Sequence, residues 1–250
     1  MTSYGKSDRG CVRPTNQDSF AIDMQPEAAL LAVCDGMGGA NAGNVASRFA
    51  IETFMGALRE GLQPDMDAAA RQSLLRNAVE RANDTVYHLS VAQPEFRGMG
   101  TTLVGCIAAK TGMTLVNVGD SRAYCVHTGG AQRLTEDHSY VEEMMRRGKL
   151  TEEAARVHPN KNLITRAIGI DPQVECDLYE VTLAPGDVLL LCSDGLSGMV
   201  RDEEMASIVC AADTLQTAGD VLIEEAKQNG GQDNITVVLY RDDHAETEEA

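Results

Sequence analysis

The chain carries, at the end of an apolar run, the stretch Val33-Cys34-Asp35-Gly36-Met37-Gly38-Gly39. Ala28 to Cys34 is apolar throughout and is bounded by turn residues, which indicates a strand that is buried on both faces. Such a strand is expected to end at Asp35, where the sheet gives way to a loop. The glycines that follow have no Cβ atom, so another group can approach this backbone closely.

Acidic turns of this kind recur along the chain. Val188 to Gly195 repeats both the apolar run and the Asp-Gly pair, and further aspartates stand at Gly119-Asp120-Ser121 and Gln232-Asp233-Asn234. One such turn means little, because Asp and Gly are common turn residues. Four strand-edge aspartates instead indicate a carboxylate cluster, which repels itself unless a cation neutralises it. Oxygen ligands without a paired His or Cys favour Mg²⁺ or Mn²⁺ over zinc.

The composition is that of a globular protein with a strong acidic excess. The 250 residues include 38 acidic and 21 basic side chains, so the formal net charge is −17. This charge disfavours nucleic acid and anionic membranes as partners, and no apolar run approaches the roughly 18 residues of a membrane span. Seven cysteines without a CxxC pair indicate reduced thiols, so we expect a cytoplasmic protein.

The hydrophobic periodicity predicts one domain over residues 1–241 and an acidic, disordered tail over 242–250. Helices are predicted at 41–60, 67–90, 140–147, 151–156, 202–211 and 215–229. Strands are predicted at 3–10, 19–23, 28–34, 101–109, 113–118, 122–127, 131–134, 175–183, 187–192 and 235–240. The four strands between 101 and 134 are separated by tight turns, which predicts one antiparallel meander.

These elements predict the fold class. The apolar stripe of each long helix needs the face of a sheet, so we expect an α+β fold, a four-layered α/β/β/α sandwich. It would contain two mostly antiparallel sheets flanked by helix pairs. The polar segment at about 136–168, with its two short helices, is expected to form a flap inserted between strands.

A candidate phosphate ligand precedes the first buried strand, in Arg13-Pro14-Thr15-Asn16-Gln17-Asp18. The planar guanidinium of arginine matches two oxygens of a phosphate group at once. A lone arginine is usually a solvated surface charge. Arg13 is a candidate because the residues that follow it, up to Asp18, form a motif with it.

Taken together, the ordered motifs resemble the metal-dependent PP2C-type (PPM) protein Ser/Thr phosphatases in their compact bacterial form. The matching stretches lie at 7–10, 13–18, 34–39, 100–102, 118–122, 134–139, 165–169, 192–196 and 233–237. They occur in the family's order and span nearly the whole chain. No single motif is specific, and the resemblance depends on the ordered set.

The resemblance implies roles for the matching positions. Two Mn²⁺ or Mg²⁺ ions would be bridged by Asp35, with the Gly36 carbonyl completing the shell of one ion. Asp194 and Asp233 would hold the other ion. A weaker third ion would be held by Asp120 together with Asp194.

The resemblance also implies how a substrate would be bound. Arg13 would bind the substrate phosphate, Asp18 would orient metal-bound waters, and Asn234 would lie beside the site. Met37 and Ala40 stand where relatives carry histidines, which leaves a metal-bound water as the expected proton donor. Asn162 is placed in the flap, where some relatives contact the third ion. His138 and His158 flank the flap and either contact substrate or serve packing.

The function implied by the resemblance is hydrolysis of phosphoserine and phosphothreonine in proteins by a metal-bridging hydroxide. The expected partners are phosphorylated proteins, a bacterial Ser/Thr kinase and its targets among them, and the protein is expected to be a monomer. One alternative is a pseudophosphatase that binds a phosphoprotein or kinase without turnover, and another is a hydrolase of small phosphoesters. A nucleotide-binding module is disfavoured, because Asn41 stands where the dinucleotide fingerprint requires glycine.

Overall fold

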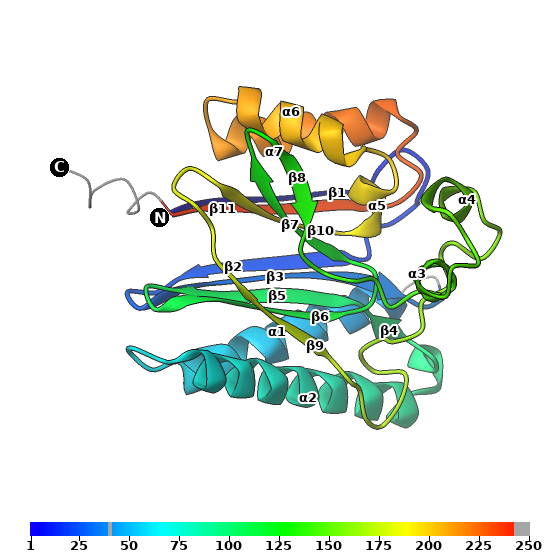
Figure 1. Cartoon of the computed structure of the whole chain (residues 1–250). Helices are drawn as coiled ribbons and strands as arrows, with labels where there is room; N and C mark the ends of the chain where they lie inside the picture. Colours follow the sequence, from blue (N-terminus) through cyan, green and yellow to red (C-terminus); the bar gives the residue numbers. More distant parts are fainter. Residues whose placement is uncertain (40–41, 243–250) are drawn as a thin grey trace.

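Two antiparallel sheets stack face to face in the computed structural model, and a pair of helices covers the outer face of each (Figure 1). The predicted four-layered sandwich is therefore confirmed. The structure describes residues 1–39 and 42–242. Ala40, the predicted helix start at Asn41 and the predicted tail from residue 243 onward lie outside the described residues.

The two sheets differ in the parts of the chain that they combine. The first joins, in spatial order, β1 (Thr2–Asp8), β11 (Ile235–Arg241), β10 (Val188–Cys192), β7 (Arg122–His127) and β8 (Gly130–Arg133). The second joins β2 (Asp18–Met24), β3 (Ala28–Met37), β5 (Leu103–Ala109), β6 (Gly112–Val118) and β9 (Asp177–Val181), with β4 (Gly100–Thr101) paired to β3. The two ends of the chain thus pair in one sheet, and β3 has neighbours on both sides.

Four helices form the outer layers, and a 3₁₀ turn (Pro94–Phe96) follows the longest of them. The helices are α1 (Ala42–Gly61) and α2 (Ala68–Ala92) against the second sheet, and α6 (Asp202–Ala211) and α7 (Leu215–Gln228) against the first (Figure 1). Polar caps start two of them: the Asp67 carboxylate accepts the Ala70 N–H at 2.8 Å, and the Thr214 hydroxyl accepts the Thr217 N–H at 3.0 Å.

The residues of β3 show how the sequence specifies the layers. Leu30, Ala32 and Cys34 pack into the core beneath α1 and α2, whereas Leu31 and Val33 pack into the core between the two sheets. All of them are fully buried. An uninterrupted apolar run is therefore required here, because both faces of this strand meet apolar neighbours.

The predicted meander is wrong, because its strands belong to different sheets. The β5–β6 hairpin lies in the second sheet and the β7–β8 hairpin lies in the first. The chain crosses between the sheets at Gly119-Asp120-Ser121, where Gly119 adopts a φ of +105° that favours glycine. A crossing and a hairpin use the same turn residues, so strand spacing alone does not distinguish them.

Two strand boundaries also differ from the prediction. Strand β3 does not end at Asp35 but continues to Met37, because Gly36 and Met37 pair with β4. The strand predicted at 101–109 is interrupted at Thr102. A short helix, α5 (Asp194–Ser197), was not predicted, since four residues are too few to show a helical period.

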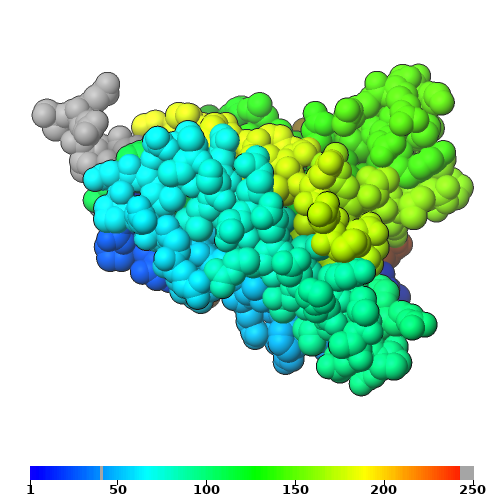
Figure 2. Space-filling model, turned by 90° about the horizontal axis from the view of Figure 1, so that it is seen from below, coloured from blue at the N-terminus to red at the C-terminus, as the bar shows by residue number. Residues whose placement is uncertain are grey.

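The predicted flap is an excursion between β8 and β9. It contains α3 (Tyr140–Arg146) and α4 (Glu152–Arg156), and it projects from one end of the sandwich (Figures 1 and 2). Within residues 1–39 and 42–242, no helix is both long and apolar enough to cross a membrane.

Candidate active site

Five aspartates gather at the end of the sandwich from which the flap projects. Asp18 and Asp35 are paired residues of β2 and β3, Asp120 lies in the crossing between the sheets, and Asp194 opens α5. Asp233 lies two residues before β11. The charges of the other four aspartates all act on Asp35. The acidic turns therefore meet at one edge, as the sequence predicts.

A cavity of about 640 Å³ opens beside this cluster. Asp120, Asp194 and Asp233 line one side of it. The flap lines another side, through residues that include Ser139, Met145, Arg156 and Asn162. Asn162 is among the residues that line the cavity, whereas His158 is not.

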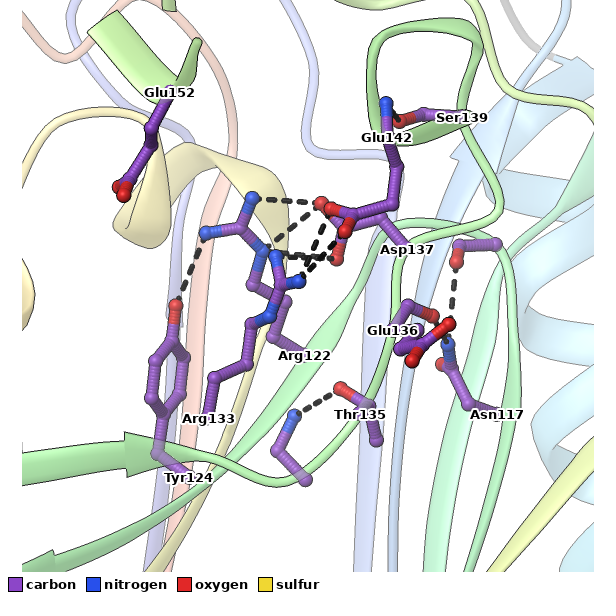
Figure 3. Close-up of polar contacts among 12 residues, drawn as sticks. Asn117, Arg122, Tyr124, Arg133, Thr135, Glu136, Asp137, Ser139, Glu142 and Glu152 are labelled. Atoms are coloured by element: carbon purple, nitrogen blue, oxygen red, sulfur yellow. Dashed lines mark hydrogen bonds and ion pairs between the residues drawn. The ribbon is translucent and has the colours of Figure 1, made fainter. Parts of the chain in front are cut away.

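Paired charges from the first sheet and the flap line part of this cavity, and Figure 3 shows their contacts. Arg122 of β7 donates to both oxygens of Asp137, at 2.9 and 2.6 Å, and to the Tyr124 hydroxyl at 3.1 Å. Arg133 of β8 donates to both oxygens of Glu142 in α3, at 3.0 Å each. These pairs fix the entry of the flap to the first sheet, and they leave each guanidinium neutralised.

Asp18 is held by hydroxyl groups from the opposite sheet. The side chains of Ser193 and Thr236 donate to its Oδ2 atom at 2.8 and 2.6 Å, while its Oδ1 atom is buried without a partner. Burial, with a smaller contribution from the charges of Asp194 and Asp233, raises the pKa of Asp18 to about 7 even though the two hydroxyl hydrogen bonds lower it.

Asp35 is fixed through its backbone by two threonines. Its N–H donates to the Thr102 hydroxyl at 2.9 Å, and its carbonyl accepts the Thr102 N–H at 2.9 Å and the Thr101 hydroxyl at 2.8 Å. The Thr102 hydroxyl also lies 2.7 Å from that of Ser121, the neighbour of Asp120. These bonds involve only the backbone of Asp35, and its carboxylate faces the cluster, where it forms a side-chain hydrogen bond with Asp194.

The glycines of both Asp-Gly pairs allow backbones to pack against each other. A Cβ atom on Gly36 would lie 2.1 Å from the Gly43 carbonyl oxygen, and one on Gly195 would lie 1.9 Å from that of Asn234. The close approach expected at these glycines is therefore made by the protein's own main chain. A side chain at either position would collide with this backbone and force the chain beside Asp35 or Asp194 to shift.

Arg13 reaches the cluster from the exposed loop after β1. Its guanidinium donates to Asp233 Oδ2 at 2.5 Å, and half of its side chain remains exposed. The sequence predicts a phosphate ligand at this position, and the structure places the guanidinium at the edge of the carboxylates. Asn234 positions the loop, because its amide group donates to the carbonyls of Arg9 and Thr15 and accepts the Gln17 N–H.

The buried carboxylates of the cluster repel one another, which favours the binding of a cation between them. Burial, followed by the neighbouring carboxylates, raises the pKa of Asp35 and Asp120 well above the ordinary range, and burial together with Asp233 raises that of Asp194. The Oδ1 atoms of Asp18 and Asp194 are buried without hydrogen-bond partners. An unpaired buried carboxylate oxygen is unfavourable, and a bound cation would satisfy it.

The donor set decides which cation fits. Only oxygen ligands are present in the cluster, which suits Mg²⁺ or Mn²⁺. Among residues 1–39 and 42–242, no three His, Cys, Asp or Glu side chains lie close enough to hold a metal ion alone. Arg13 instead neutralises Asp233. The donor types therefore fit a hard cation, and the carboxylates would have to draw together around it, with main-chain oxygen and water completing its shell.

Several residues that shape the site carry no predicted role. They are the hydroxyl residues Thr101, Thr102, Ser121, Ser193 and Thr236, and each of them holds an aspartate or its turn. The first four stand within two positions of an aspartate or in the Gly100-Thr101-Thr102 motif, which is the signal that could have identified them. Thr236 stands within the matching stretch 233–237, three positions after Asp233, and it reaches Asp18 across the two stacked sheets.

Comparison with protein families and named proteins identifies relatives over nearly the whole chain. A family model described as Protein phosphatase 2C matches residues 12–230. The serine/threonine phosphatase stp of Listeria monocytogenes is 39% identical over 247 residues, which cover 97% of this chain and 96% of that protein. The serine/threonine protein phosphatase PstP of Mycobacterium tuberculosis is 38% identical over 94% of this chain and 43% of its own length.

Solved structures agree with these relatives. The crystal structure of a bacterial serine phosphatase superposes with a TM-score of 0.89 at 35% identity and covers 97% of this chain and 99% of that one. The serine/threonine phosphatase Stp1 of Staphylococcus aureus gives a TM-score of 0.87 at 34% identity, covering 95% and 93% of the two chains.

Proposed function

Because this chain belongs to the protein phosphatase 2C family and is a protein serine/threonine phosphatase, we propose that it hydrolyses phosphoserine and phosphothreonine with the help of bound Mn²⁺ or Mg²⁺. The observation that carries this proposal is the set of buried carboxylates beside the cavity, two of which have unpartnered oxygens. Asp35 and the Gly36 carbonyl would hold one ion, and Asp35, Asp194 and Asp233 would hold a second. Asp120 and Asp194 would hold a weaker third.

The bound cations would activate a shared water molecule for attack on phosphorus and neutralise charge on the phosphoryl oxygens. Arg13, which lies at the rim beside Asp233, is proposed to bind the substrate phosphate through its guanidinium fork. Asp18 is proposed to orient water through its free Oδ1 atom, since Ser193 and Thr236 occupy only Oδ2. No cysteine is needed as a nucleophile: burial raises the pKa of the Cys34 and Cys192 thiols beyond the physiological range, so neither forms a thiolate.

We also propose that the substrates are phosphorylated proteins in the cytoplasm, a bacterial Ser/Thr kinase and its targets among them, and that the protein acts as a monomer. The cavity supports a protein substrate, since its flap side offers surface beyond the reach of a phosphate group alone. The pseudophosphatase alternative is disfavoured by the complete carboxylate set, because a protein without turnover has no need of these costly buried charges.

The proposed metal dependence is tested by stripping the protein of metal and assaying release of phosphate from a phosphothreonine peptide. We expect no release in EDTA, and a rise to full activity as Mn²⁺ is added back. Ca²⁺ serves as a control, because it binds oxygen ligands at longer distances and activates water poorly. Turnover that persists in excess EDTA would contradict metal-assisted hydrolysis.

Arg13→Ala is expected to raise KM for a phosphopeptide by about 10- to 100-fold, because a charge-assisted contact to phosphate is worth about 1.5–3 kcal/mol. The effect on kcat should be smaller, since the carboxylates remain in place. Arg13→Lys should recover part of the loss, because it keeps the charge but not the fork. Arg76→Ala, on an exposed position of α2, is the matched control. An unchanged KM in Arg13→Ala would place Arg13 outside the site.

A further inference from the structure

We propose that His138 is a positioning residue, which fixes the turn bearing Asp120 to the stem of the flap; the inference rests on the function proposed for Asp120. His138 stands where the chain enters the flap, and only 6% of it is exposed. It is not among the residues that line the cavity. Its effect on the reaction would therefore pass through the groups that it holds.

The first of these groups is the backbone of Gly119. The ring Nδ1 atom of His138 accepts the Gly119 N–H at 3.1 Å, and the His138 N–H donates to the Gly119 carbonyl at 2.9 Å. Both polar groups of Gly119 are thus bonded to one residue. Because Asp120 follows directly, the orientation of its peptide unit is set by these two bonds.

The second group is the far end of the flap. The His138 carbonyl accepts the Thr165 N–H at 2.7 Å, and Ser139 and Ile164 form a β-bridge next to it. The two ends of the flap therefore lie side by side at His138. A displacement of the flap stem would act directly on the bonds that hold Gly119.

The ring orientation is fixed from its other side. Nε2 lies 3.1 Å from Asp177 Oδ2 and 3.2 Å from Arg166 Nη1, and Arg166 donates to Asp177 Oδ1 at 2.9 Å. Of these two neighbours only Asp177 can accept a hydrogen bond, because a guanidinium group has no acceptor. Because Nδ1 accepts a hydrogen bond from a backbone N–H, the ring proton must reside on Nε2, which then donates to Asp177. Asp177 on β9 thus keeps the ring in the tautomer that can hold Gly119.

The neighbours of His138 bind the same two segments. The Asn117 side chain donates to the Glu136 carbonyl at 3.0 Å and to the Gly119 carbonyl at 3.2 Å, and Asp137 forms its bidentate pair with Arg122 (Figure 3). The stem residues 136–138 and the crossing 117–122 therefore form one hydrogen-bonded unit. Ser121 extends this unit through Thr102 to the backbone of Asp35.

Two substitutions separate the bonds of the ring. In His138→Asn the amide oxygen can replace Nδ1 and accept the Gly119 N–H, but the side chain is too short for Asp177. In His138→Gln the amide nitrogen can replace Nε2 and donate to Asp177, but the bond to Gly119 is lost. His127→Ala is the matched control, because the His127 ring also accepts a backbone N–H, that of Gly129, far from the flap.

The experiment measures Mn²⁺ binding by calorimetry and hydrogen exchange of the Gly119 amide in the metal-free protein, for the wild type and these variants. In His138→Gln we expect the hydrogen of the Gly119 amide to exchange at least about tenfold faster than in the wild type. We also expect the lower-affinity Mn²⁺ site to bind about 10- to 100-fold more weakly. The tighter binding should be retained. His138→Asn and His127→Ala should resemble the wild type in both measurements.

Two outcomes would overturn the inference. In the first, His138→Gln changes neither the exchange rate of the Gly119 amide nor the Mn²⁺ affinity of the weaker site. In the second, His138→Asn speeds up this exchange and weakens this site, which would make Asp177 the important partner of the ring. The second outcome stays accessible even if His138→Gln does not fold. Failure of the proposed function is distinguishable, because it would appear as absence of Mn²⁺ binding in the wild type itself, while the exchange measurement needs no metal.

Discussion

Asp194→Ala is expected to lower phosphatase turnover by at least about 10³-fold at a metal concentration that saturates the wild type, and Asp35→Ala is expected to do the same. Asp194 is shared by two of the proposed ion sites and Asp35 by the two core ions. Removing either carboxylate therefore removes a ligand that no other side chain can replace. The measurement is steady-state hydrolysis of a phosphothreonine peptide across a Mn²⁺ titration.

The same variants are expected to remain folded. Asp35 and Asp194 have pKa values raised by burial and by their neighbours, so each charge opposes the folded state when no cation is bound. Replacing one by alanine should leave the melting temperature in EDTA unchanged or higher. Asp84→Ala, on an exposed position of α2, is the control for loss of one acidic charge. Turnover near that of the wild type in either site variant would refute the proposed metal ligands.

The fold could be predicted largely because burial imposes strong patterns on the sequence. The apolar run before Asp35 has alternate side chains in two different cores, and the run before Asp194 belongs to a strand that is buried throughout. Such runs can only be interior strands, and the long helices must then cover the outer faces. The crossing at Gly119 could not be predicted, because the residues of a turn do not reveal which sheet the next strand joins.

The site could be predicted in part, for a similar reason. Aspartates at strand ends were expected to converge, and they do, since those strand ends share one edge of the sandwich. The hydroxyl groups that hold them were not recognised, because Ser193 and Thr236 contact Asp18 across 175 and 218 positions of sequence. Hydrogen bonds between two stacked sheets join residues that are far apart in the sequence, and they leave no local pattern.

The metal-free protein is expected to lose stability as the pH rises from about 4 to about 7. Burial raises the pKa of Asp18 to about 7 in the folded chain, and those of Asp35, Asp120 and Asp194 are raised as well. An aspartate in the unfolded chain has a pKa of about 3.9, which is about three units below the pKa of Asp18 in the folded chain. The folded state therefore binds more protons than the unfolded state in this pH window. Stability should therefore fall by about 1.4 kcal/mol per pH unit for each group that titrates in one state only.

Other groups do not reverse this sign. Burial lowers the pKa of His138, so the folded protein binds fewer protons at this residue near pH 6 than the unfolded chain does. This makes stability rise with pH there, but one histidine offsets the opposite contribution of only one carboxylate. Asp23 and Asp177 have lowered pKa values, and they influence stability only below the window. Urea unfolding in EDTA measures the slope. Adding Mn²⁺ should abolish most of it, because bound cations replace the protons. A stability that rises with pH in EDTA would contradict the raised pKa values.

Asp18→Asn assigns part of this slope to one residue. Its amide oxygen can still accept the Ser193 and Thr236 hydroxyl groups, but it carries no charge. The variant should therefore be more stable than the wild type in EDTA at neutral pH and equal to it near pH 4, with Asp84→Asn as the control. An unchanged slope would remove Asp18 from the titrating cluster. In Mn²⁺ the gain should disappear, because there the charge of Asp18 faces cations and no longer only carboxylates. A charge that destabilises the empty site would thus favour the metal-loaded enzyme.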